Sequence, residues 1–173
     1  MTTIASPSTH RIGLVREPVG LAALLRTKAD WGTSLLRLTL GIVMFPHGAQ
    51  KLLGWFGGYG DRGTMDFFTH QMHIPALFAF LAIMAEFAGS LGLITGFLTR
   101  VAAFGIAVNM IVALLLVHGH VGFFMNWYGQ YPAGTEGFEY ALLAIGVAVY
   151  LIVKGGGKAS VDGQIANLLK IAD

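Results

Sequence analysis

The sequence contains no cysteine and few charged residues. Without cysteine the chain has no disulfide, no thiolate nucleophile, no CxxC redox pair and no thiolate ligand for an iron–sulfur cluster. Only 12% of the 173 residues are charged and 55% are hydrophobic, whereas soluble domains carry about 25% charged residues. The net charge of +2 is small and no basic patch is interleaved with aromatic residues, so nucleic acid is not an expected partner. The composition predicts a single domain solvated largely by lipid.

Four long apolar segments approach the ~20 residues that a helix needs to cross a bilayer. They cover about residues 31–53, 74–98, 101–117 and 138–153. A soluble four-helix bundle would need a polar face on each helix, and Val101–Val117 has almost none. We therefore predict an all-α integral membrane protein, a bundle of four transmembrane helices.

The two ends of the chain combine apolar and polar residues, and we expect each to form a short interfacial helix. Glu17–Lys28 has Pro18 at a position that suits a first helical turn, and Ser160–Asp173 has apolar residues at helical spacing. Frayed ends are the alternative. The expected organisation is an N-terminal extension (1–30), a transmembrane domain (31–153) and a C-terminal tail (154–173).

Lysine and arginine residues near the ends of the spans predict the orientation in the membrane. The outer side has two basic residues: Lys51, just before the loop 54–73, and Arg62 within it. The second outer loop, 119–137, has no lysine or arginine. The remaining basic residues near the spans fall on the side of the two termini: Arg11, Arg16, Arg26, Lys28, Arg100, Lys154, Lys158 and Lys170. We expect both termini in the cytoplasm, and Met1–Asp30 lacks the apolar run and cleavage site of a signal peptide.

Ionisable side chains inside the spans point to function, because each costs about 2.5–3.5 kcal/mol at bilayer depth on insertion scales. Glu86 lies near the middle of the second span, which contains no cation that can pair with it. At about 100° per residue, Arg37, His47 and Lys51 fall on one half of the first span. We expect this polar stripe to face the bundle interior and to provide a partner for Glu86, which otherwise has to stay protonated. Arg37 is expected to hold Glu86 or a neighbouring carbonyl. The alternative is a structural ion pair or hydrogen bond that fixes the helix register.

More polar residues follow at the outer ends of the other spans. Asn109 lies at mid-depth in the third span, which ends at His118 and His120. Glu139 opens the fourth span at a depth where it can meet Lys51 or His118. Histidines two residues apart do not share a helix face, and no third ligand follows at a fixed spacing, so neither a metal nor a haem is expected.

Aromatic residues crowd both outer loops, with Trp55 in the first loop and Trp127 in the second. One interpretation is the ordinary aromatic belt at the membrane interface. The other is a lid over a flat hydrophobic ligand. The sequence alone leaves both interpretations open.

Three short motifs occur in a fixed order within residues 37–60, 85–100 and 139–163. They are hG-x-x-K (His47, Gly48, Lys51), E-x-x-G (Glu86, Gly89) and G-x-x-S-x-D (Gly157, Ser160, Asp162). With these motifs the chain resembles the DoxX family of small four-helix membrane proteins. The resemblance covers nearly all of the chain after Trp31.

The resemblance implies a multi-pass protein of the bacterial inner membrane that is tied to respiratory or redox processes. Members of this family are associated with thiosulfate:quinone oxidoreduction and with a terminal quinol oxidase. Others are linked to resistance to quinones, catechols or thiol stress. Because this chain lacks cysteine, a mechanism based on a thiol relay is excluded here.

The polar stripe and the resemblance lead to one hypothesis: a quinone-interacting oxidoreductase, or the membrane subunit of one, that couples oxidation of a small donor, such as a sulfur compound, to quinone. A quinone needs a flat apolar slot with a proton donor at each carbonyl oxygen. In this hypothesis His47, Lys51 and Glu86 contact the quinone or transfer protons. The supporting residues are Arg37, Asn109, His118, Glu139, Trp55 and Trp127.

Two other classes of function stay open. The first is a non-catalytic anchor or assembly subunit of a redox complex. The second is a small-molecule carrier that works as an oligomer. An anchor predicts that substitutions at Gly92 and Gly96 are more harmful than those at His47 or Glu86. The expected partners are the lipid bilayer, the quinone, a redox partner subunit and further copies of the chain.

Overall fold

The computed structural model describes residues 20–132 and 134–171, and all regular structure in these ranges is helical. The α-helices are α1 (Leu21–Leu25), α2 (Trp31–Leu53), α3 (Gly60–Asp66), α4 (Ala76–Thr95), α5 (Thr99–Ala113), α6 (Glu139–Lys154) and α7 (Val161–Leu168). A 3₁₀ turn follows α2 (η1, Trp55–Gly57), and π-helical turns follow α3 (η2, Phe67–Gln71) and α5 (η3, Leu114–His118).

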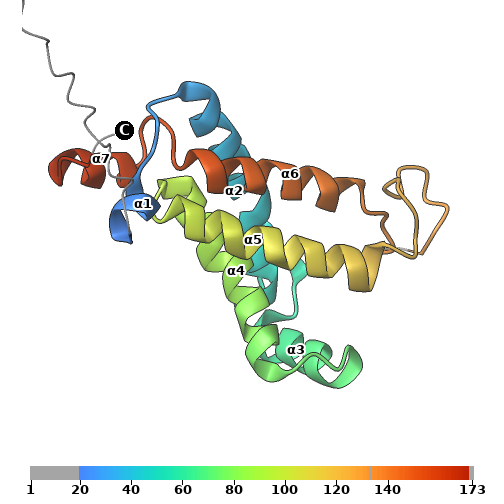
Figure 1. Cartoon of the computed structure of the whole chain (residues 1–173). Helices are drawn as coiled ribbons and strands as arrows, with labels where there is room; N and C mark the ends of the chain where they lie inside the picture. The colour runs from blue at the N-terminus through green and yellow to red at the C-terminus, as the bar shows by residue number, and fades with distance from the viewer. Residues whose placement is uncertain (1–19, 133, 172–173) are drawn as a thin grey trace, which may run out of the picture.

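The four long helices form two arms that diverge from a common base (Figure 1). Helices α2 and α4 pack together in one arm, which ends at α3, and α5 packs on α6 in the other arm, which ends at the loop 119–137. Helix α4 also packs on α5, and α1 and α7 contact each other at the base. The chain thus places its two outer loops at the tips of different arms.

Each predicted span lies on a helix, with bounds shifted by a few residues. Two segments are long and apolar enough to cross a membrane by length and composition, Ala76–Thr95 and Thr99–His118. Helix α2 is long enough but carries Arg37 and Lys51, and α6 has only 16 residues. The predicted end helices correspond to α1 and α7, while Glu17 and Pro18 lie outside the described residues.

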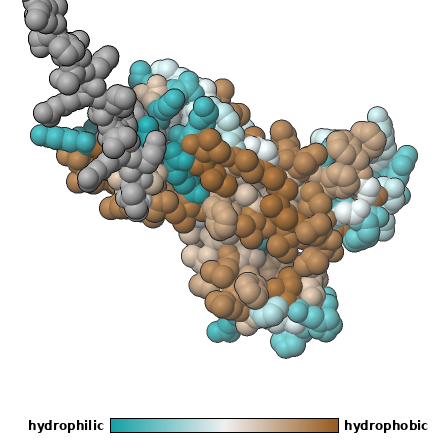
Figure 2. Space-filling model, viewed as in Figure 1, coloured by the Kyte–Doolittle hydropathy of each residue, from teal (hydrophilic) through white to brown (hydrophobic). Residues whose placement is uncertain are grey.

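Apolar side chains cover much of the outer surface of both arms, and hydrophilic residues gather at the tips (Figure 2). Leu35, Leu77, Phe104 and Leu143 are each at least 60% exposed. Single exposed apolar residues are ordinary in soluble proteins, but a continuous surface of this kind marks contact with lipid or protein. The surface therefore agrees with a chain solvated by lipid.

Glycines bring α2 and α4 into close contact. A Cβ atom added at Gly48 would lie 2.5 Å from the backbone nitrogen and Cα of Phe87, and one added at Gly41 would lie 3.0 Å from the nitrogen of Ile94. The prediction that glycines on the polar face of the first span allow close approach is confirmed. In the predicted GxxxG pair, Gly92 packs near α5, but Gly96 ends α4 in the left-handed conformation, with φ at 71°.

Replacing Gly48 with alanine is expected to destabilise the protein by about 1–3 kcal/mol, because the added methyl group forces two backbones apart. The matched control is Gly146→Ala in α6, where an added Cβ meets nothing within 4 Å. Alanine there is expected to stabilise the helix by up to ~1 kcal/mol. Thermal unfolding in detergent measures both, and equal midpoints for the two variants would contradict the close contact.

The closing motif of the sequence holds the base of the bundle together. The Asp162 carboxylate accepts hydrogen bonds from the backbone nitrogens of Leu98, at 2.7 Å, and Thr99, at 2.8 Å, and so caps the start of α5. Ser160 caps α7 by accepting from the nitrogen of Gly163. The Ser160 and Asp162 positions of the G-x-x-S-x-D motif therefore have structural roles: the serine caps its own helix, and the aspartate caps a helix that is distant in sequence.

Asp30 begins α2 by accepting hydrogen bonds from the side chain and the backbone nitrogen of Thr33, both at 2.7 Å. These two bonds lower the pKa of the Asp30 carboxyl below its ordinary value. The Thr33 hydroxyl also lies 2.9 Å from the hydroxyl of Tyr150 on α6. Asp30 thus stays charged at neutral pH, and its capped turn is tied to the other arm.

Candidate functional site

A cavity of about 600 Å³ lies where the two arms begin to diverge. Its walls come from α2, the η2 turn, α4, α5 with η3, the end of the loop 119–137, and the start of α6. Most of the lining is apolar. The polar and ionisable side chains in the lining are His47, Lys51, Glu86, Asn109, His118, His120, Thr135, Glu136 and Tyr140.

Glu86 lies at the inner end of this cavity and is held by two other helices. Its Oε2 accepts a hydrogen bond from Lys51 Nζ at 2.5 Å, and its Oε1 accepts from Asn109 Nδ2 at 2.7 Å. Glu86 is only 3% exposed, whereas the side chain of Lys51 is 29% exposed. The prediction that Glu86 finds its partner on another helix is confirmed, and we call these three residues the carboxylate cluster.

The close packing of α2 on α4 explains why Lys51 reaches Glu86. Gly48 lies directly against the backbone of Glu86 and Phe87, and Lys51 follows Gly48 by three residues on a neighbouring part of the helix surface. A larger residue at position 48 would move α2 away from α4. The hG-x-x-K motif therefore positions a lysine against a buried carboxylate.

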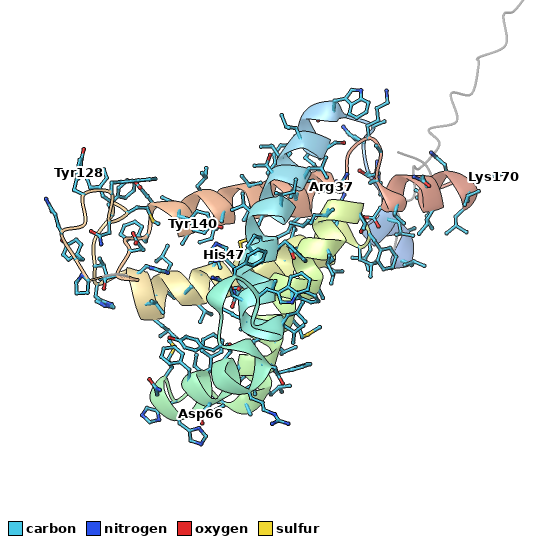
Figure 3. All side chains as sticks on the ribbon, turned by 180° about the vertical axis from the view of Figure 1, so that it is seen from behind. Arg37, His47, Asp66, Tyr128, Tyr140 and Lys170 are labelled. Atoms are coloured by element: carbon cyan, nitrogen blue, oxygen red, sulfur yellow. The ribbon has the colours of Figure 1, made fainter. Side chains whose placement is uncertain are left out.

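His47 and Tyr140 face each other across the cavity from different arms. Their ring centroids are 6.0 Å apart with the planes tilted by 44°, and Figure 3 shows both residues near the crossing of the arms. The Tyr140 hydroxyl donates a hydrogen bond to the sulfur of Met44, at 3.3 Å. Both rings line the same space as the carboxylate cluster.

The outer end of the cavity carries polar groups of the second loop. His118 Nδ1 lies 2.8 Å from the backbone oxygen of Glu136, and the Glu136 carboxylate accepts a hydrogen bond from the nitrogen of Asn126 at 2.6 Å. His120 also lines this end. The cavity thus has polar groups at both ends, with apolar walls between them.

Arg37 does not reach the cavity. Of its two expected partners, Glu86 or a neighbouring carbonyl, the structure shows carbonyl oxygens. Its guanidinium donates to four backbone carbonyl oxygens at the base of the bundle, where Figure 3 labels it. These carbonyls belong to the last turn of α4 and to the segment before α7: Leu93, Ile94, Gly156 and Ala159. A backbone role for Arg37 replaces its predicted role near a cofactor.

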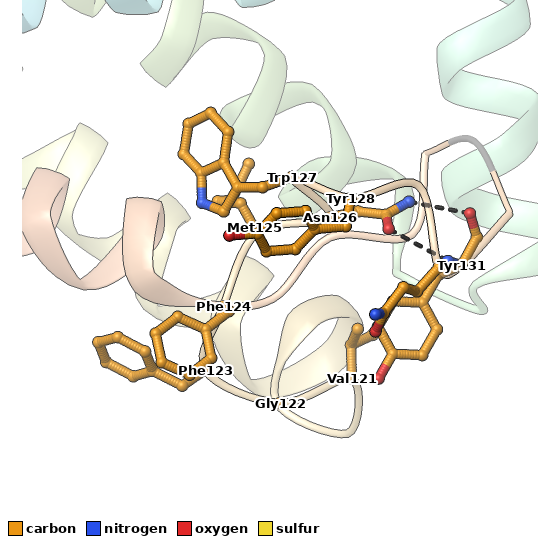
Figure 4. Close-up of a pocket in the computed structure, with 10 residues that line it drawn as sticks. Val121, Gly122, Phe123, Phe124, Met125, Asn126, Trp127, Tyr128 and Tyr131 are labelled. Carbon is orange, nitrogen blue, oxygen red and sulfur yellow. Dashed lines mark hydrogen bonds between the residues drawn. The ribbon is translucent and has the colours of Figure 1, made fainter.

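Glu139 is likewise turned away from Lys51 and His118, its two expected partners. Its Oε1 accepts hydrogen bonds from the indole nitrogen of Trp127, at 2.7 Å, and from the nitrogen of Met125, at 3.2 Å. Trp127 lines a separate, shallower pocket of about 530 Å³ within the loop (Figure 4). Glu139 therefore anchors the aromatic loop.

Trp55 lies outside both pockets, 53% exposed and edge-on to Phe56. Neither tryptophan covers the carboxylate cluster. In the part of the chain that the structure describes, no three histidine, aspartate or glutamate side chains come together as a metal site. The sequence-predicted residues that the cavity brings together are His47, Lys51, Glu86, Asn109 and His118.

Sequence reasoning missed Tyr140 and Phe68 as lining residues. Tyr140 follows Glu139 directly, and the prediction from the sequence assigned a site role to the charged Glu139 instead. Its position one turn before Ala144, a core residue of α6, is the signal that would have placed it on the inner face. Phe68 belongs to a π-helical turn, whose face cannot be deduced from α-helical spacing.

Comparison with known proteins identifies a family whose sequence profile covers helices α2 to α5. The sequence profile of the DoxX family matches residues 32–119, just over half of the chain. The chain is also similar to a protein of Bacillus subtilis (strain 168) named "Putative oxidoreductase CatD", with 28% identity over 131 residues, which is 76% of this chain and 84% of that protein. No solved structure matches the chain.

Proposed function

The chain belongs to the DoxX family, and on this premise we propose that it is a quinone-linked oxidoreductase of the bacterial inner membrane, or the membrane subunit of one. The name of the Bacillus subtilis relative supports an oxidoreductase role. The donor is a small molecule, such as a sulfur compound, or a redox partner protein. Because the sequence has no cysteine, no thiol of this chain takes part.

In this proposal α2, α4, α5 with η3, and α6 cross the membrane, with both termini in the cytoplasm. Support comes from the exposed apolar surface of both arms and from the two helices that are long and apolar enough to span. The charged α2 is accommodated because Lys51 is paired with Glu86 and Arg37 is buried at the base. The outer loops then lie on the side opposite the termini.

One observation carries the proposal: a buried carboxylate, compensated by a lysine and an asparagine, opens onto a cavity with largely apolar walls. A volume of about 600 Å³ lies within the ~300–1,000 Å³ of ordinary ligand sites. A quinone ring is flat and apolar, with two oxygen atoms that accept hydrogen bonds. The donors available to those oxygens are Lys51 and His47, since the Tyr140 hydroxyl donates to the sulfur of Met44.

A bound quinone supplies a two-electron, two-proton carrier whose charge develops on its oxygen atoms. Lys51 Nζ has three donor hydrogens, of which one is directed to Glu86, so others are free to stabilise an oxygen that becomes negative. Glu86 holds the lysine in place and balances its charge. The His47 imidazole offers a ring N–H that can donate to a quinone oxygen, and His118 lies at the outer end of the cavity.

Extraction of the purified protein tests this proposal. The parent protein in detergent is expected to retain quinone, identified by mass spectrometry after solvent extraction, and a His47→Ala/Glu86→Gln double variant is expected to lose it. The control is Trp55→Ala, which changes an exposed side chain outside the cavity. A parent that carries no quinone, and that co-purifies with a membrane partner also retained by the double variant, would favour a non-catalytic subunit.

A further inference from the structure

We infer that the quinone bound in this cavity carries a long apolar tail, and that the tail lies in the groove between the two arms. This inference rests on the proposed function and specifies its substrate class: quinones dissolved in the bilayer, as opposed to small quinones dissolved in water. It is argued from the walls of the cavity beyond the carboxylate cluster.

The cavity continues from the carboxylate cluster into an apolar groove with one wall on each arm. Phe67 and Phe68 of η2, followed by Met72 and Ile74, form the wall on the arm of α2 and α4. Three residues, Val112, Leu116 and Val117, form the wall on α5 and η3. We call these seven residues the tail groove.

The tail groove is continuous with the surface that faces the hydrocarbon. Val108, Val112 and Leu116 follow one another at intervals of four residues and are 44%, 40% and 54% exposed. Residues four apart are neighbours on a helix surface, so this row runs from the outside of α5 into the groove. No polar side chain interrupts the row, so an alkyl chain moving along it meets only apolar groups.

Beyond Val117 the lining of the cavity becomes polar. His118, His120 and Glu136 line the route toward the outer loop, where a small water-soluble molecule would enter. His118 and Glu136 each have one partner in the protein, but an alkyl tail at this end would displace water from their other polar atoms and offer no hydrogen bond in return. The head of a tailed quinone therefore lies at the carboxylate cluster, and its tail leaves along the groove.

Both walls of the tail groove include a π-helical turn, Phe67–Gln71 on one arm and Leu114–His118 on the other. Such turns are rare and occur frequently at functional sites. On the α5 side the turn contributes Leu116 and Val117 to the groove. Two π-helical turns that face one ligand cavity from separate arms indicate that this part of each arm is shaped for a ligand.

The test is a tryptophan placed in the groove, Leu116→Trp, with Leu115→Trp as its matched control. Leu115 is the preceding residue in the same turn, is 69% exposed and does not line the cavity. Both variants add the same bulk to an exposed position, so neither is expected to impair folding. Val112→Trp provides a second obstruction one turn away.

Each protein is embedded in nanodiscs and equilibrated with 2,3-dimethoxy-5-methyl-1,4-benzoquinone or with the same ring bearing a ten-carbon tail, and bound quinone is counted after extraction. The tailed quinone is expected to bind Leu116→Trp and Val112→Trp at least ~10-fold more weakly than the parent, and the tail-less quinone within ~2-fold. Leu115→Trp is expected to bind both quinones as the parent does.

Two results would overturn the inference while leaving the proposed function intact. One is unchanged binding of the tailed quinone to both groove variants, and the other is an equal loss of both quinones. A parent that binds neither quinone overturns the proposed function, and the inference with it. Quinone binding by the parent protein therefore distinguishes failure of the inference from failure of the proposed function.

Discussion

Replacing Lys51 with methionine is expected to destabilise the protein by about 2–4 kcal/mol and to abolish quinone-linked activity. The substitution keeps an unbranched side chain but leaves the Glu86 carboxylate, 3% exposed, without its cation. Loss of one partner from a fully buried pair costs about 3–5 kcal/mol. We expect a smaller loss of stability here because the Lys51 side chain is 29% exposed and Asn109 still donates to Glu86.

The double variant Lys51→Met/Glu86→Gln separates stability from function. A neutral glutamine keeps the hydrogen bond from Asn109 and no longer needs a cation, so stability is expected to recover by more than half. Quinone-linked activity is expected to stay absent, because the donor at position 51 is still missing. Thermal unfolding and a quinol-formation assay on the same preparations measure both. Recovery of activity together with stability would show that the pair only holds the helices.

Arg37→Ala is expected to destabilise the protein by about 3–5 kcal/mol, because four backbone carbonyls lose a charged donor and a cavity forms in its place. Arg37 is 1% exposed and joins α2 to the end of α4 and to the segment before α7. Lys158 and Lys170 are already exposed, and loosening of the base should make the backbone beside them easier for trypsin to cleave. Thermal unfolding and trypsin digestion in detergent measure the two effects.

Two further variants make this result specific. Arg37→Lys keeps the charge but lacks the planar guanidinium that serves several acceptors at once, so about half of the loss is expected to remain. Arg62→Ala removes an exposed arginine from α3 and is expected to leave the melting temperature unchanged. In folded Arg37→Lys protein, quinone retention is expected to equal that of the parent. Loss of quinone from the folded Arg37→Lys variant would instead indicate that Arg37 contacts the ligand.

The polar stripe on the first span therefore serves two purposes along one helix. At the base, Arg37 binds the carbonyls that end α4. Nearer the outer end of the same helix, His47 and Lys51 face a cavity. The difference between these positions comes from their surroundings: the base is closed by α7 and its preceding segment, while the arms diverge above it.

The sequence by itself determined the helices and the partner requirement of Glu86. Long apolar runs placed the four predicted spans on α2, α4, α5 with η3, and α6, because hydrophobicity and helical period are local properties of the chain. An ionisable residue without a cation in its own span predicted a partner elsewhere, and Lys51 and Asn109 provide it. The glycines beside Lys51 predicted the close approach of two helices.

Only the tertiary structure decided which polar residues share one cavity. Arg37, His47 and Lys51 fall on one helical face, but their roles depend on which neighbouring helix lies beside each of them. Glu139 and Tyr140 are adjacent in sequence, yet Glu139 holds the aromatic loop and Tyr140 faces His47. The divergence of the arms, the tail groove and the two π-helical turns arise from contacts between residues distant in sequence. Periodicity describes the face of one helix, and only packing between helices specifies what that face contacts.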